Sequence, residues 1–188
     1  MRGIGARAGK WCFSSGWELR IYNGVMLALR YAYLLALVVW LGGMVALGAV
    51  VAPTTFQVLQ ASEPVAGRAL AGELFGVTLA RFHYVTYGAG AVLLLSLTAM
   101  AVLGPRPVHF LVRTIIVTAM LLVALYSGFV VLGGINQIQQ EVGTLPSRLP
   151  ITDSRRIAFD SLHQLSTRLM MLNMLAALVL LYWEARES

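Results

Sequence analysis

The chain has 188 residues, of which 59% are hydrophobic and only 12% are charged, and its mean hydropathy is +0.77. Ordinary soluble domains carry about twice that share of charged residues, so this composition excludes one. The net charge of +6 comes from 14 basic residues that are scattered and form no run, which argues against a nucleic-acid-binding protein. The only cysteine, Cys12, allows no internal disulfide.

The first two apolar tracts are long enough to cross a bilayer. One covers residues 31–51, and Pro53 is expected to end or kink its helix. Pro53 also blocks a signal-peptide cleavage site after 50–52, so this tract is expected to remain as a membrane span. The other lies in a helix predicted over 64–103, of which only 84–103 is free of charge.

Two more tracts complete the set. The third covers residues 110–132, and the fourth belongs to a helix that begins near the capping residue Asp153 and continues to Trp183. The charge-free part of this last helix, 169–183, is short, but the preceding amphipathic turns lengthen it. The sequence therefore predicts an all-α antiparallel bundle of four transmembrane helices, with the second and fourth extending beyond the membrane.

The domain organisation follows from the same pattern. Residues 1–22 are rich in Gly, Ser and Arg and show no apolar period, so they are interpreted as a loose N-terminal tail. Residues 23–188 then form a single four-helix transmembrane domain, in an inner or plasma membrane, with the lipid bilayer as its first partner. Other membrane subunits are a further possible partner, and nucleic acid is not.

Small residues recur on one face of the second helix. This face is expected to pack closely against a neighbouring helix, since small side chains let two backbones approach. The stripe consists of Ala69, Gly72, Gly76, Ala80, His83, Tyr87 and Gly90.

Two histidines are the most specific candidates for chemistry. His83 and His163 each stand where a charge-free stretch begins, and alternating topology places both on the same, extracytoplasmic side. Imidazoles on two facing helices can bind a transition metal or haem iron. The alternative is two interfacial histidines that bond to backbone or water. His109 lies at the opposite membrane face and is not part of this pair.

The remaining polar candidates predict a pocket inside the bundle. On the fourth helix His163, Ser166 and Asn173 share one face, and polar groups within spans usually face the interior. For Ser166 and Asn173 the competing interpretation is hydrogen bonding between helices. The predicted pocket residues besides the histidines are Gln57, Glu73, Asn136, Asp160, Ser166 and Asn173.

These features favour a protein that binds, or helps to move, a small solute or metal, without catalysis and without an obligatory cofactor. No catalytic residue is expected, because Asp160, His163 and Ser166 lie along one helix and no oxyanion hole accompanies them. Two alternatives remain: a structural or assembly subunit of a larger membrane complex, and a small haem or metal redox protein that uses His83 and His163.

Several short motifs resemble those of one family. The run Trp40 to Gly43, then Ala52–Pro53 with Phe56 and Leu59, followed by Gly72 and Phe75, resembles the start of the DUF4149 family, also called TMEM205-like. The later Phe159, Leu162–His163, Ser166 and Asn173 resemble its closing pattern. The resemblance covers about residues 26–185 and implies a small four-helix membrane protein. Its eukaryotic relatives are linked to tolerance of platinum drugs, which suggests handling of metals or small molecules.

The topology is testable. Four spans place both termini on one side, and that side carries eight basic residues against six opposite, which favours cytoplasmic termini. Reporter fusions at Ser188 and within the loop 135–152 are expected to report opposite compartments, with Ser188 inside. An extracytoplasmic Ser188 would overturn this orientation.

Overall fold

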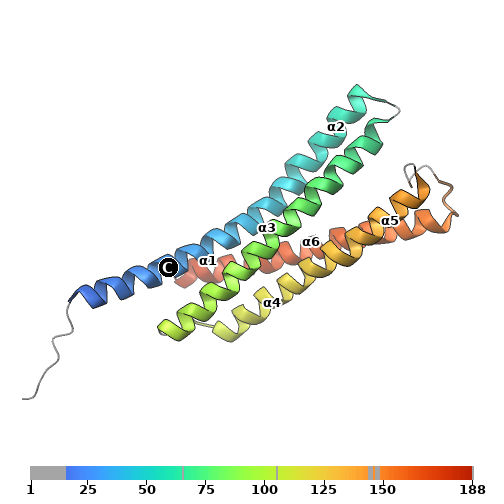
Figure 1. Cartoon of the computed structure of the whole chain (residues 1–188). Helices are drawn as coiled ribbons and strands as arrows, with labels where there is room; N and C mark the ends of the chain where they lie inside the picture. The colour runs from blue at the N-terminus through green and yellow to red at the C-terminus, as the bar shows by residue number, and fades with distance from the viewer. Residues whose placement is uncertain (1–15, 65, 105, 144–145, 147–148, 188) are drawn as a thin grey trace, which may run out of the picture.

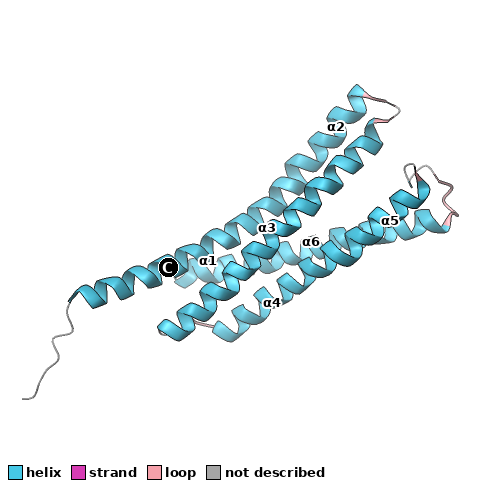
Figure 2. Ribbon diagram, in the orientation of Figure 1, coloured by secondary structure: helices cyan, strands magenta, loops and turns pink. Residues whose placement is uncertain are grey.

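The computed structural model describes residues 16–64, 66–104, 106–143, 146 and 149–187, and these form helices joined by short loops, with no strand among them (Figure 2). The helices are α1 (Gly16–Ala46), α2 (Ala52–Ser62), α3 (Gly67–Leu103), α4 (Phe110–Tyr126), α5 (Leu132–Val142) and α6 (Ser154–Glu187). Two π-helical turns, η1 (Leu47–Val51) and η2 (Ser127–Val131), join α1 to α2 and α4 to α5. The all-α prediction is confirmed.

The helices form two hairpins (Figure 1). In the first, the continuous rod α1–η1–α2 reverses after Ser62, and α3 runs back along it. In the second, α4–η2–α5 is followed by α6, which returns toward the first hairpin. The hairpins lie close together near the chain's C-terminus and diverge toward α2 and α5, so a cleft opens between them.

Each π-helical turn contains one residue more than a regular α-helical turn. In each, the following amide bonds five residues back instead of four: Ala52 N–H donates to Leu47 O, and Leu132 N–H donates to Ser127 O. Pro53 lies two residues after η1, in the first turn of α2, and lacks the amide proton that an α-helix would use. Pro53 was expected to end or kink the helix. The helix does not end there, because it continues through η1 to Ser62, but its regular α-helical winding is interrupted at η1.

The sequence predicted the start of the last helix more accurately than the start of the first. The first helix begins at Gly16, so the part of the expected loose tail from 16 to 22 is helical, while 1–15 lie outside the described residues. The last helix begins as expected. Asp153 Oδ1 accepts a 2.9 Å hydrogen bond from the Arg155 amide, which is the cap that its position predicted. The Arg155 side chain also contacts this carboxylate and lowers the pKa of Asp153.

The chain is an integral membrane protein. Four helical runs among the described residues are long and apolar enough to cross a bilayer: Arg20–Ser62, Gly67–Leu103, Phe110–Val142 and Ser154–Arg186. Their outer faces expose large apolar side chains such as Leu95, Leu122 and Leu175. Such a surface is unfavourable in water but suits contact with lipid.

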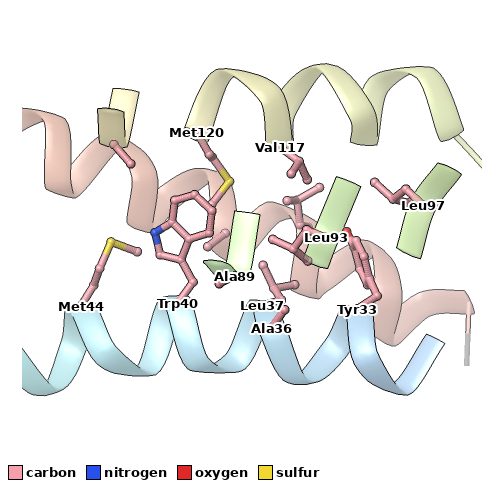
Figure 3. Packing of buried hydrophobic residues seen from close by; sticks show 13 residues of the cluster. Tyr33, Ala36, Leu37, Trp40, Met44, Ala89, Leu93, Leu97, Val117 and Met120 are labelled. Carbon is pink, nitrogen blue, oxygen red and sulfur yellow. The ribbon is translucent and has the colours of Figure 1, made fainter. Parts of the chain in front are cut away.

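A compact apolar cluster holds the hairpins together at their closed end (Figure 3). Trp40 of α1 is fully buried and lies against the helices of both hairpins. Gly90 of α3 makes this approach possible, because a Cβ there would be 3.1 Å from the Trp40 ring and 2.8 Å from Leu121. The same cluster includes Leu93 from α3 and Met120 from α4.

A buried ion cluster lies at this closed end. Glu184 of α6 is 3% exposed, and its carboxylate accepts hydrogen bonds from Arg30 of α1 and, at 2.8 Å, from Arg113 of α4. Arg113 is 2% exposed. Arg30 thus pairs across the bundle with a residue of the last helix. Three helices from both hairpins thus share one carboxylate.

Removal of this carboxylate should loosen the bundle. Glu184→Leu leaves the buried Arg113 guanidinium without the carboxylate opposite it, which is expected to cost about 3–5 kcal/mol. Thermal unfolding in detergent measures the effect. The control is Asp160→Asn, which removes an exposed contact to Arg156 at 3.8 Å and should cost less than about 1 kcal/mol. Equal midpoints for the two variants would show that the cluster does not hold the hairpins together.

Candidate functional site

The cleft between the hairpins contains a cavity of about 390 Å³. This volume lies within the range of about 300–1,000 Å³ typical of small-molecule sites. Most of its wall is apolar, and none of the described residues along it is acidic or carries Lys or Arg. Its polar groups are His83 and Thr86 on α3, Ser127 on η2, Asn136 and Gln139 on α5, and His163, Ser166, Thr167 and Asn173 on α6.

His83 is the most firmly positioned polar group of this wall. Its Nδ1 lies 2.8 Å from the carbonyl oxygen of Leu79, and a carbonyl can only accept, so Nδ1 carries the proton. In the neutral ring Nε2 is then a hydrogen-bond acceptor. Gly128 of η2 packs against the imidazole, because a Cβ there would come within 2.9 Å of it. The π-helical turn η2 therefore forms part of the surface against which the His83 ring packs.

His163 reaches the same cavity from the opposite hairpin. Its ring stacks on Phe159, one turn earlier on α6, with centroids 6.2 Å apart and planes 7° apart. Both histidines line one cavity, as their positions in the sequence predict. The role of the pair as metal ligands stays a prediction. His109 lies elsewhere, with its ring centroid 5.8 Å from that of Trp183 and the two planes tilted by 32°.

Asn173 is buried at the inner end of the cavity, with 6% of its surface exposed. The expected alternative for this residue was a hydrogen bond between helices, but its side chain makes none within the described part of the chain. The amide atoms are not fully enclosed by the described protein atoms, so they reach the open space of the cavity. The Asn173 amide is therefore available to a molecule in the cavity.

The small-residue stripe of α3 has a different role from the expected one. A Cβ at Gly72 or Gly76 would meet nothing within 4 Å, so neither glycine contacts a neighbouring helix closely. Both line the cavity instead. The expected helix interface at this part of the stripe is therefore wrong. The hairpins diverge here, and the missing side chains leave the cleft open.

A second compartment, whose wall includes charged side chains, adjoins the cavity between α3 and α5. It shares Gly72, Gly76, Asn136 and Gln139 with the cavity wall, so the two spaces are neighbours. Glu73 and Arg81 line only this outer compartment, together with Gln140. Glu73 was expected in the same pocket as the histidines and lies next to it instead.

Two of the predicted pocket residues lie elsewhere. Gln57 is exposed and lines neither compartment. Asp160 is exposed and contacts Arg156 on the same helix at 3.8 Å. Both point away from the cleft. The sequence did not predict this, because helical spacing gives the depth of a residue but not which face of the helix meets a partner. Among the described residues, no group of three or more His, Cys, Asp or Glu side chains is arranged to hold a metal ion.

Sequence reasoning missed three parts of the site. The π-helical turns were not predicted, although Ser127–Gly128 inside an apolar span was a visible signal. Aromatic residues that line the outer half of the cavity, Phe56 and Phe75, were seen only as motif positions. The Glu184 ion cluster, which holds the closed end, was also missed, although Arg113 stands three residues inside its span.

The fold and the cavity define a small helical membrane protein with an internal cleft. Over residues 35–143, more than half of the chain, the sequence matches the family described as "Domain of unknown function (DUF4149)". The chain belongs to this family. The matched region ends before α6, so the resemblance noted in 159–173 lies outside it. Neither a curated protein nor a solved structure matches the chain.

Proposed function

We propose that the protein is a non-catalytic membrane protein that binds a small molecule in the cleft, with an uncharged and mainly apolar part of that molecule in the cavity. The observation that carries this proposal is the Asn173 amide, which lines the cavity and has no hydrogen-bond partner among the described residues. His83 Nε2 offers an acceptor on the same wall. An apolar wall with a limited number of polar groups is typical of small-molecule sites, where the polar groups orient the ligand.

A metal ion is a less suitable occupant than such a molecule. Thiolate and carboxylate ligands are missing from the described wall, and two imidazoles alone fill only half of a four-ligand site. An assembly role is also less well supported, because Gly72 and Gly76 of the small-residue stripe line the cleft rather than a lipid-facing surface that could dock on another subunit. Movement of the ligand across the membrane, with both termini cytoplasmic, remains part of the proposal.

A side chain that fills the cavity should abolish binding. Gly76→Phe adds a ring where a Cβ has open space, so it should occupy the cleft without disturbing the helices. Native mass spectrometry of protein released from lipid nanodiscs measures any small molecule that remains bound. We expect an adduct on the wild type and its loss by about tenfold or more in the variant, equivalent to at least about 1.4 kcal/mol.

The matched control is Gly88→Phe. Gly88 lies on the same helix and also has nothing within 4 Å of a Cβ, but it is exposed and lines neither compartment. This variant should retain the adduct. Absence of any adduct on the wild type, or its equal retention in both variants, would contradict binding in the cleft.

Haem is a second candidate ligand. His83 and His163 line one cavity from α3 and α6, and the bond from Nδ1 of His83 to a backbone carbonyl orients Nε2 as a metal-binding nitrogen. Against this candidate, no Arg or Lys on the described wall would pair with the haem propionates.

An absorbance spectrum separates the two candidates. After expression with added haem, a haem protein should show a Soret band that His83→Leu abolishes and Gln57→Leu, away from the cleft, leaves unchanged. A wild-type spectrum without this band would remove haem from consideration and leave the uncharged ligand.

A further inference from the structure

The cleft continues past the level at which the helices leave the hydrocarbon. On α3 and α6 the charge-free segments begin after Arg81 and Arg168, both exposed, and about 20 residues of helix cross the bilayer. The charge-bearing turns well before these arginines, with the paired segments α2 and α5, are therefore expected to project from the membrane as two wings. Their outer faces carry exposed polar side chains, among them Gln57 on α2 and Glu141 on α5, beside exposed apolar ones such as Leu74 on α3.

The inner faces of the same wings are apolar. Phe56 of α2, Phe75 of α3, Ile135 of α5 and Phe159 of α6 line the part of the cavity that lies between the wings. From Phe159 to Asn173 the cavity follows 14 residues of α6, about 21 Å along the helix axis. A mainly apolar channel is thus expected to lead from the level of the bilayer core toward the space outside the membrane.

The outer compartment gives this channel a polar side opening. Glu73 and Arg81 of α3 and Gln140 of α5 line it, and it joins the apolar cavity past Gly72 and Gly76. Glu73 and Arg81 are eight residues apart on α3, about 12 Å, and neither forms an ion pair with another described side chain. The cleft therefore offers an apolar space for a chain and, beside it, a polar space with both signs of charge.

We propose that the occupant is a single-chain lipid amphiphile whose chain lies in the cavity and whose polar head lies in the outer compartment, raised above the membrane surface. This inference rests on the proposed binding function and names its ligand class. A lipid in this position has left the plane of the bilayer before it leaves the protein. The wings thereby present its head to an acceptor on the side where α2 and α5 project.

Photocrosslinking tests the two halves of the proposal separately. The protein is placed in phosphatidylcholine vesicles that contain lysophosphatidylcholine with a diazirine either at the end of the chain or on the head. The chain probe should label the cavity wall at Phe159, Met170 or Met44, and the head probe should label Glu73 or Gln140. Gly76→Phe, which narrows the passage between the compartments, should remove both labels, and Gly88→Phe should keep them.

The outcomes distinguish this inference from the binding function beneath it. Head labelling confined to lipid-facing positions near Tyr31 or Tyr126, with the adduct of the wild type still lost in Gly76→Phe, would overturn the lipid ligand and leave the binding site. Chain labels only on exposed outer residues such as Leu95, together with no adduct on the wild type, would overturn both. Labels at Phe159 and Glu73 that Gly88→Phe retains and Gly76→Phe loses would support the proposal.

Discussion

One carboxylate, that of Glu184, holds the two hairpins together at one end of the bundle. Glu184 lies near the end of the chain, and Arg30 and Arg113 contact it from the first and second hairpins. Because a charge in an apolar interior is costly unless it is paired, this contact fixes the three helices relative to one another at one end. Beyond it the hairpins have no comparable tie among the described residues, and they diverge. The cleft is the space that results.

Glycine shapes the two ends of the molecule in opposite ways. At Gly90 the lack of a side chain lets Trp40 and Leu121 pack against α3, so the closed end is dense. At Gly72 and Gly76 no neighbour moves into the vacated space, so the open end stays hollow. The residue type is the same, and the distance between the hairpins determines whether it produces contact or volume.

The sequence predicted well what depends on a single helix. The four spans and the Asp153 cap follow from apolar length and local hydrogen bonding, and the structure has them. It also predicted that His83 and His163 line one cavity, because the depth of a residue along a helix follows from counting residues. It misplaced Gln57 and Asp160, because which face of a helix meets a partner depends on the other helices. The Glu184 contacts span 71 and 154 residues, and no periodicity in one helix reveals such pairs.

The π-helical turns add a constraint on the length of the chain itself. Each holds one more residue than an α-helix would, and each residue turns a helix by about 100°. Deletion of one residue in η1 would restore regular winding and rotate everything from Ala52 to Ser62 by that angle. Phe56 would then leave the cleft and a polar face of α2 would enter it. At these two places the family should tolerate substitutions more readily than insertions or deletions.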